Sequence, residues 1–407
     1  MAELTFQDLT FREEDEKVRV NFLNIFYFYL DKGLLNKIAA FKISSNAIYF
    51  EGISEEKARR RLYLLLEQGF QNLTNRLDHK KAIYIHKNSQ IPLIGTNYFG
   101  LIDRGTNLIE IKPVTSCNLG CIYCSVDEGP KSRRKVDFVV EKDYIIEEFR
   151  KIVEYKAIGN IDAHINAQGE PLLYDDMPGL VEDIAKMRQI KVISIDTNGI
   201  LLTKQLVDRL ADAGLTRINL SLNALDPKIA DLMAGFPYNL KRVMEIAAYI
   251  PKTKIDLLIA PVWLPGYNDN EIVKLAKFAK DIGAGRHCPP IGIQNFLPYK
   301  FGRNPVKEVS IDMFYKKLRE MEKEHNIRLI YDKEDFGIVE AKELPKPFKK
   351  GQIIEAEIAF PGRLKNEMLA VAKNRLISVP NCDKESGFIR VKIRRTKHNI
   401  FLGELLS

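Results

Sequence analysis

VTSCNLGCIYCSV, at residues 114–126, indicates more about this protein than any other stretch of the chain. Its three cysteines, Cys117, Cys121 and Cys124, are spaced as C-x₃-C-x₂-C. Three thiolates can ligate three irons of a [4Fe–4S] cube, and the fourth iron then stays open to bind and activate a small molecule. The alternative is a structural zinc site, which is four-coordinate and usually built from paired C-x₂-C or Cys/His units. The closest downstream histidine is His164, so the spacing favours the cluster.

The composition is that of a globular protein with a sizeable core. The chain has 407 residues, 45% of them hydrophobic, and this length predicts two or three domains. We find no apolar run of about 18 residues that would predict a membrane span, and MAELTFQDLTFREEDEK at the start lacks the apolar stretch of a signal peptide. Five cysteines, three of them clustered, do not resemble a disulfide framework. We therefore expect a cytoplasmic protein that does not associate with a membrane.

Residues 96–332 alternate β-like apolar runs with helix-like segments. The expected strands are 108–113, 161–166, 191–196, 216–222, 254–260 and 291–296. The expected helices are 141–156, 176–188, 203–213, 239–249, 269–282 and 311–325. Continuous apolar strands that alternate with helices predict an α/β fold in which helices cover a parallel sheet. In parallel α/β barrels the chemistry lies at the carboxyl ends of the strands, so the motifs that follow the strands are the candidate site.

Two further parts flank this region. Residues 1–95 contain a charged amphipathic stretch at 55–67 and an alternating stretch at 81–86, which together predict a small α+β accessory domain. Residues 333–350 are polar, contain two prolines and are typical of a linker. Residues 351–407 hold five short apolar runs at 353–359, 368–373, 376–379, 388–393 and 400–405. These runs predict a small β-barrel of OB-like architecture.

The positive charge of the chain is concentrated near its C-terminal end. The formal net charge is +8. The stretch from Lys349 to Ser407 contains 12 Lys or Arg and 6 Asp or Glu, so it carries +6 of that charge. This asymmetry predicts a polyanionic partner for the C-terminal part.

With Tyr123 just before the last cysteine, the cysteine motif resembles the signature of the radical S-adenosylmethionine (SAM) enzymes. The resemblance implies a partial (β/α)₆ barrel over residues 96–332, with the cysteine loop after its first strand. It also implies a [4Fe–4S] cluster and SAM as cofactors, because in that family the open iron chelates the amino and carboxylate groups of SAM. One electron from the cluster cleaves SAM to methionine and a 5′-deoxyadenosyl radical. An electron donor such as a ferredoxin or flavodoxin is therefore an expected partner.

The resemblance further implies a set of SAM-binding residues at the ends of later strands. In NAQGEPLL, Gln168, Gly169 and Glu170 correspond to the family motif that holds the SAM amino group, with Gln168 in place of a glycine. The other candidates are Tyr123 beside the cluster, Asp196, Thr197 and Asn198 in SIDTNG, Ser221 and Asn223 in NLSLNA, and Ala260, whose backbone would contact adenine. The alternatives at these positions are ordinary turns and helix caps.

Two sets of residues are candidates for substrate binding. Tyr299, Lys300 and Arg303 combine an aromatic ring with two cations after the sixth expected strand, a pattern that suits a nucleotide. The alternative is a solvated loop. Residues 351–407 resemble a TRAM domain, an RNA-binding β-barrel found on tRNA- and rRNA-modifying enzymes. Its strand FIRVKIRR supplies the other candidates, which are Arg390, Lys392, Arg394 and Arg395.

These features together predict a radical SAM enzyme that modifies RNA, with a tRNA nucleoside as the expected target. The first alternative is a radical SAM enzyme that acts on a peptide or a small metabolite. The second is a non-catalytic RNA-binding protein with a structural metal. Cys288 and Cys382 are expected to be structural, and the sequence leaves open the role of residues 1–95 and the oligomeric state.

Overall fold

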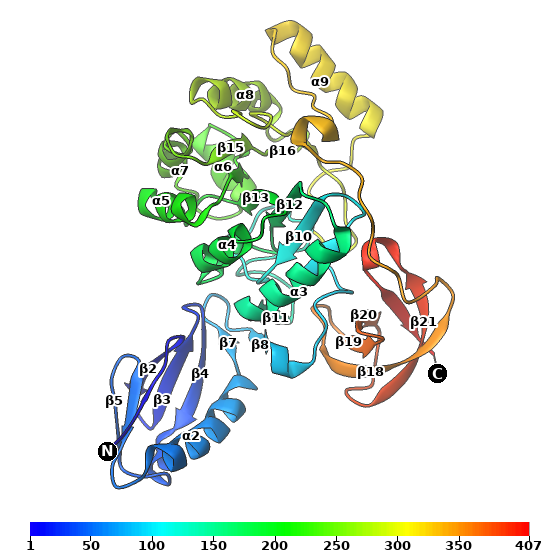
Figure 1. The fold of residues 1–407 in the computed structure, drawn as a ribbon. Coiled ribbons are helices and arrows are strands. Elements are labelled where there is room, and N and C mark those ends of the chain that lie inside the picture. The colour runs from blue at the N-terminus through cyan, green and yellow to red at the C-terminus, as the bar shows by residue number, and fades with distance from the viewer. Residues whose placement is uncertain (407) are drawn as a thin grey trace. The chain divides into compact units, whose positions relative to one another are not determined.

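The computed structural model describes residues 1–406, which form two compact units. The first unit comprises residues 1–85 together with 135–139, and the second comprises the other described residues, 86–134 and 140–406. Each unit has its own sheets and its own core (Figure 1). Within the described residues, no helix is both long and apolar enough to cross a membrane.

The first unit is richer in strands than the sequence predicts. One sheet has the order β1 (Ala2–Thr5), β6 (Ala47–Phe50) and β5 (Phe41–Ile43). The other has the order β11 (Val136–Val140), β8 (Lys81–Ile85), β7 (Thr74–Asn75), β4 (Phe26–Asp31), β3 (Lys17–Phe22) and β2 (Leu9–Glu14). Two helices, α1 (Lys32–Asn36) and α2 (Glu55–Phe70), accompany them.

The main sheet of the second unit has six strands, five of which are parallel. Its order is β15 (Asp256–Ile259), β14 (Arg217–Leu220), β13 (Ile190–Thr197), β12 (Ile161–Ile165), β10 (Leu108–Lys112) and β9 (Gly100–Asp103). Strand β9 is antiparallel to β10, and the other neighbours are parallel. Strands β14 and β15 are buried along their whole length, as expected when helices cover a parallel sheet.

Helices alternate with these strands, as the sequence predicts (Figure 1). They are α3 (Lys142–Lys156), α4 (Met177–Ala185), α5 (Lys204–Ala213), α6 (Pro227–Ala234), α7 (Leu240–Ala247), α8 (Ile272–Asp281) and α9 (Ile311–His325). Helix α5 ends at Gly214, whose φ of 103° is the left-handed conformation that glycine adopts readily. The predicted sixth strand is short: Ile291 makes a single parallel bridge to Ile259, and β17 (Gln294–Asn295) pairs with β16 (Val262–Trp263).

The C-terminal part forms a closed five-stranded barrel. Its strands are β18 (Ile353–Pro361), β19 (Glu367–Ala372), β20 (Arg375–Pro380), β21 (Phe388–Arg395) and β22 (Leu402–Leu405). Backbone bonds fix the barrel to the segment before β9, because Leu376 N–H donates to Ile94 and Phe401 N–H donates to Gly95. A Cβ atom on Gly95 would lie 2.1 Å from the Leu376 carbonyl oxygen, so this close approach requires glycine.

Candidate functional site

The three cysteines of the motif lie in the loop after β10 and line one cavity of about 390 Å³. All three are partly exposed and none is in a disulfide. The cavity lies at the carboxyl end of the parallel strands, where Thr197 ends β13 and Ser221 follows β14. Among the described residues, no three His, Cys, Asp or Glu side chains gather closely enough to hold a single metal ion.

Each of the three sulfurs receives a hydrogen bond, which fits thiolate ligands of a cluster. Leu119 N–H donates to Cys117 Sγ at 3.5 Å, and Glu128 N–H donates to Cys124 Sγ at 3.3 Å. The Tyr123 hydroxyl donates to Cys121. Burial raises the pKa of the Cys121 thiol to about 12, so the thiol is protonated at neutral pH when iron is absent. Binding of iron replaces this proton and converts the thiol to a thiolate. The donor set therefore suits a [4Fe–4S] cluster with three protein ligands.

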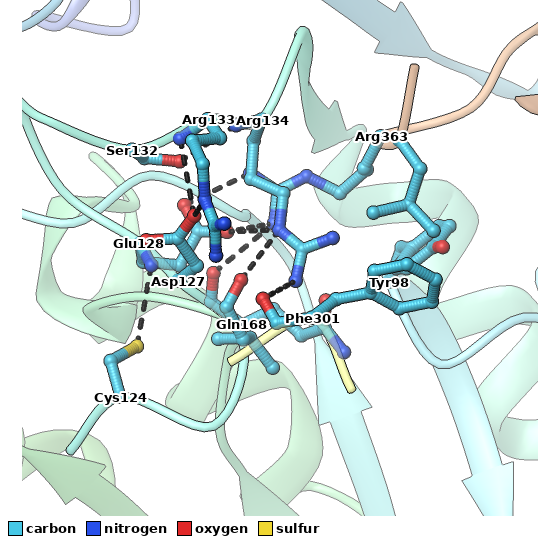
Figure 2. Close-up of polar contacts among 12 residues, drawn as sticks. Tyr98, Cys124, Asp127, Glu128, Ser132, Arg133, Arg134, Gln168, Phe301 and Arg363 are labelled. Atoms are coloured by element: carbon cyan, nitrogen blue, oxygen red, sulfur yellow. Dashed lines mark hydrogen bonds and ion pairs between the residues drawn. The ribbon is translucent and has the colours of Figure 1, made fainter. Parts of the chain in front are cut away.

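Three arginines contact the loop that carries these cysteines, and Figure 2 shows two of them, Arg134 and Arg363. Arg303, which the sequence suggests as a substrate contact, donates from Nε to Asp127 Oδ1 at 2.8 Å and from Nη1 to the Cys121 carbonyl at 3.0 Å. Arg134 donates from Nε to the Val126 carbonyl at 2.5 Å. The third, Arg363, comes from the turn between β18 and β19 and pairs with Glu128. The loop conformation thus depends on residues far away in the sequence.

Glu170, in the NAQGEPLL motif, is buried beside the cysteine loop. Its carboxylate accepts hydrogen bonds from Thr197 Oγ1 at 2.8 Å and from the backbone N–H groups of Asn198 at 2.8 Å and Leu172 at 3.1 Å. Burial raises the pKa of Glu170 to about 7, although these hydrogen bonds oppose the rise. A Cβ atom on the neighbouring Gly169 would lie 2.0 Å from the Ser116 carbonyl oxygen, so this position requires glycine.

The structure brings most of the other expected SAM-binding residues to the same cavity. The lining contains Tyr123, Gly169, Glu170, Asp196, Thr197, Asn198, Ser221, Asn223 and Ala260. Gln168 is buried beside the cavity but does not line it, and its carbonyl oxygen lies 3.5 Å from Arg363 Nη1. Asn223 links two walls, since its Nδ2 donates to the Tyr123 hydroxyl at 2.6 Å and its Oδ1 accepts from Val262 N–H at 2.8 Å.

The expected substrate-binding residues lie in different places. Tyr299 lines the cavity and is half-exposed, whereas Lys300 lies outside its lining. Arg390 and Arg394 are on the outer face of β21, where Glu355 and Glu404 on the neighbouring strands lie close to them. Their charges are therefore partly neutralised by adjacent carboxylates.

A second cavity of about 350 Å³, lined in part by residues of β12 to β15, was not expected from the sequence. It shares Asp196, Ala260 and Gln294 with the first. Its other lining residues are His164, Asn219, Leu258, Gly292, Ile293, Phe314, Tyr315, Leu318, Leu329, Ile330, Tyr331 and Phe336. The shared residues make the two cavities neighbours, with Asp196 on their common wall.

A closed ring of polar contacts fixes that common wall. In order around the ring, its members are His164, Ser194, Asp162, Arg217, Asn219 and Asp196. The five hydrogen bonds are 2.9 to 3.1 Å long, and an ion-pair contact of 3.3 Å between His164 Nε2 and Asp196 Oδ2 closes the ring. The members stand at alternate positions of β12, β13 and β14, so period-two polar residues in otherwise apolar strands are the signal that could have revealed them.

The chain is similar to known proteins in sequence and in fold. A model of the radical SAM superfamily matches residues 111–279. The uncharacterized protein MJ0103 of Methanocaldococcus jannaschii is 41% identical over 361 residues, which are 82% of this chain and 83% of that protein. The GTP 3′,8-cyclase of Aquifex aeolicus is 26% identical over 258 residues, or 61% of this chain and 78% of that enzyme.

Among solved structures, SuiB of Streptococcus suis bound to S-adenosylmethionine matches with a TM-score of 0.43 and 17% identity, covering 81% of this chain and 72% of SuiB. The match to the family model and the similarity to the relatives in sequence are sufficient to assign the chain to a family. The chain belongs to the radical SAM superfamily, and its cofactors are a [4Fe–4S] cluster and SAM.

Proposed function

We propose that this protein is a radical SAM enzyme that removes a hydrogen atom from a nucleotide of an RNA, with tRNA as the first candidate substrate. When bound, the cluster and SAM supply one electron and the 5′-deoxyadenosyl radical that takes up the hydrogen. The chain's own residues would orient SAM. Ionised Glu170 is placed to accept hydrogen bonds from an ammonium group, and Ser221 and Asn223 offer further polar groups in the same cavity.

The observation that carries a nucleotide substrate is the composition of the second cavity. Phe314, Tyr315 and Tyr331 supply aromatic surface, and Gln294 supplies an amide that can both donate and accept hydrogen bonds. Stacking surface combined with amide edges is what an unstacked nucleobase requires. Because this cavity adjoins the first at Asp196, a base bound there would hold its ribose close to the SAM cavity.

The C-terminal barrel supports RNA as the carrier of that nucleotide. It contributes most of the net positive charge, and phosphate contacts of a basic module supply affinity through counterion release. Its Arg363 binds Glu128, which lines the first cavity, so the barrel lies directly beside that cavity. A polynucleotide held there could present one nucleotide to the cavity after that nucleotide leaves its stack. The setting we propose is cytoplasmic, with a ferredoxin or flavodoxin as electron donor.

A free purine nucleotide is the second candidate substrate. It is favoured by relatives named GTP 3′,8-cyclase or probable GTP 3′,8-cyclase, which are similar over 61% and 42% of this chain. The same aromatic and amide cavity suits a free base equally well, but such a substrate leaves the charge of the C-terminal barrel without a role.

Two measurements test the proposal together. The first compares modified nucleosides of tRNA and rRNA, by mass spectrometry, between a strain that lacks the gene and its parent. The second follows 5′-deoxyadenosine production by anaerobically reconstituted protein with a chemical reductant, with tRNA from the deletion strain or with GTP. The C121A variant, which lacks one cluster ligand, is the control for non-enzymatic SAM breakdown.

A nucleoside that disappears in the deletion strain, with 5′-deoxyadenosine formed faster in the presence of its tRNA, supports an RNA substrate. Stimulation by GTP combined with an unchanged nucleoside profile would replace RNA by the free nucleotide. An unchanged profile without stimulation by either substrate would overturn the proposal in favour of a peptide or another small metabolite.

A further inference from the structure

One face of the strands β2, β3 and β4 in the N-terminal unit is open and polar. The side chains alternate strictly, and the inward set, which includes Phe11, Val20 and Phe28, is buried. Helix α2 packs along this inward side, where a Cβ atom on Gly69 would lie 2.3 Å from the Phe28 ring (Figure 1). The outward set includes Thr10, Arg12, Glu14, Lys17, Arg19, Asn21, Tyr27 and Tyr29. An open polar face is ordinary for a sheet of this kind, so a function requires further observations.

The first such observation is a pocket of about 230 Å³ on this face. Its lining consists of Thr10, Arg12, Arg19, Asn21, Asn24 and Arg76. Three of these residues are arginines and none carries a carboxylate. Asn21 Nδ2 donates to Thr10 Oγ1 at 3.2 Å, which fixes the polar floor between the two strands. The pocket is therefore a concentration of hydrogen-bond donors and positive charge.

The second observation is that two of these arginines oppose one another directly. Arg12 on β2 is the register partner of Arg19 on β3. Like charges directly opposite in an antiparallel pair are destabilising. Glu14 only partly offsets the repulsion between the two guanidinium groups, because its carboxylate lies 3.9 Å from Arg12 Nε and 3.9 Å from Arg19 Nη1, beyond hydrogen-bonding distance. Folding alone gives no reason for this arrangement, whereas an anion between the two guanidinium groups would.

The third observation concerns Arg19 itself. Its Nε atom is buried and has no hydrogen-bond partner among the described residues. A buried donor without an acceptor destabilises the folded protein. The guanidinium lies over the Tyr27 ring, 4.1 Å from its centroid, so its plane is already held in one orientation. A guanidinium that is held in one orientation is suited to binding a phosphate through its terminal nitrogens.

We propose that this arginine pocket on the open face of β2, β3 and β4 binds the phosphate backbone of the substrate RNA through Arg12, Arg19 and Arg76. Tyr29, which is 42% exposed beside the pocket, offers a ring on which an unpaired base can stack. The proposal rests on the proposed function, because it assigns to the N-terminal unit a part in holding the RNA substrate. It also separates the role of this unit from that of the C-terminal barrel, where neighbouring glutamates partly neutralise the cations.

The test measures binding of full-length protein to total tRNA by fluorescence anisotropy over a range of salt concentrations. The variants are R19Q, R76Q and the double variant R19Q/R76Q. The matched control is R60Q/R61Q, which makes the same charge change on exposed positions of α2. Competition with inorganic phosphate at constant ionic strength distinguishes a phosphate site from general charge attraction. SAM binding, measured on the same preparations, reports whether the second unit is intact.

We expect R19Q/R76Q to bind tRNA roughly tenfold more weakly, with a salt slope smaller by about one per arginine removed. The control should bind as the unchanged protein does, and inorganic phosphate should weaken tRNA binding by the unchanged protein more than by R19Q/R76Q.

If the double variant binds tRNA with unchanged affinity and salt slope, this inference is wrong while the proposed function stands. If the unchanged protein binds no tRNA and its deletion alters no nucleoside, both fail. The conservative R19K variant should restore part of the affinity if charge at this position is what matters.

Discussion

Arg363 and Glu128 form a buried ion pair that connects the C-terminal barrel to the cysteine loop. Arg363 is 0% exposed, its Nη2 lies 2.9 Å from Glu128 Oε2, and its Nη1 contacts Glu128 Oε1 (Figure 2). The backbone N–H of Glu128 in turn donates to Cys124 Sγ. A residue of the C-terminal barrel thus fixes the position of a group that is hydrogen-bonded to a cluster ligand.

The R363Q variant should weaken retention of the cluster. It leaves the buried Glu128 carboxylate with only Arg134, whose Nε lies 4.0 Å from Glu128 Oε1, and so weakens the support of the loop that carries Cys124. Partners that orient metal ligands typically change metal affinity by roughly ten- to a hundredfold when removed. We therefore expect a chelator to extract iron from R363Q about tenfold faster than from the unchanged protein, as followed by the loss of iron–sulfur absorbance. The potential of the cluster should also fall, because one fewer cation lies near it.

Two comparisons separate this effect from misfolding. The K365Q variant removes an exposed cation from the same turn and should release iron at the unchanged rate. The R363M/E128M variant removes both charges and should fold, since apolar replacement of a buried pair is often tolerated. Iron release as slow from R363Q as from K365Q would show that the pair has no influence on the cluster.

Glu170 should make the stability of the iron-free protein fall as pH rises. Burial raises its pKa from 4.5 to about 7, so the folded state binds the proton more tightly than the unfolded state does. The stability associated with the neutral carboxyl is fully present below pH 4.5 and is lost as pH rises to about 7. The difference of about 2.5 pKa units corresponds to about 3 kcal/mol. In E170Q, the fall in unfolding free energy between pH 5 and pH 8 should be smaller by up to about 3 kcal/mol.

The same variant should bind SAM more weakly. A charged hydrogen bond to an ammonium group contributes about 1.5–3 kcal/mol, so the dissociation constant of SAM should rise by roughly ten- to a hundredfold in E170Q. Equilibrium dialysis on the reconstituted protein measures it. E170Q should therefore lose less stability as pH rises and yet bind SAM more weakly, and this combination is the distinctive result. Unchanged SAM affinity in E170Q would show that Glu170 does not bind SAM.

His164 and Asp196 should contribute stability in a window of neutral and mildly acidic pH. Burial lowers the pKa of His164, but the carboxylates of Asp196, Asp162 and Glu110 outweigh it, and the pKa is raised above 6.5. Burial raises the pKa of Asp196, but His164 outweighs it, and the pKa falls below 3.8. Arg217 belongs to the same ring and donates to Asp162 at 2.9 Å. The histidine contribution is fully present below pH 6.5 and is lost as pH rises through the folded pKa, and the aspartate contribution is lost at the acidic end.

The H164Q variant tests this pair. Chemical denaturation between pH 5 and pH 9 should show a decline above pH 6.5 in the unchanged protein that is smaller in H164Q. The H325Q variant, which changes a histidine at the end of α9, should keep the decline. Parallel curves for H164Q and the unchanged protein would mean that His164 does not titrate in this range.

Local patterns in the sequence were sufficient to predict the parallel strands and the cysteine loop. The run at 161–166 became β12 (Ile161–Ile165), in which Ile161, Ala163 and Ile165 are buried, while Asp162 and His164 at the alternate positions enter the ring of polar contacts. The run at 291–296 formed little strand, since Pro289 and Pro290 precede it and Gly292 interrupts it. The alternating apolar residues at 17–22 and 26–31 are typical of half-buried strands, and these segments form β3 and β4.

Contacts between distant residues could not be predicted from the sequence. Arg363 lies 235 residues from Glu128, and no local pattern distinguishes it from the exposed arginines of the same barrel. Arg303 was expected to contact substrate because it stands beside Tyr299, yet its guanidinium binds the cysteine loop. Such pairs form only when the tertiary structure brings distant side chains together. Composition and periodicity do not distinguish an arginine that forms such a pair from one that is exposed.

Two neighbouring arginines on β21 should differ in their contribution to RNA binding. Arg394 is paired with Glu404, whereas Arg395 is exposed and has no ion pair within the described residues. A cation that is already paired releases fewer counterions when it meets a phosphate. We therefore expect R395Q to weaken tRNA binding and to reduce the salt slope by about one, and R394Q to change both less. Fluorescence anisotropy in a salt series measures the difference. The E404Q variant, which frees Arg394, should strengthen binding if the pairing with Glu404 is what limits it, and equal effects of R394Q and R395Q would show that it is not.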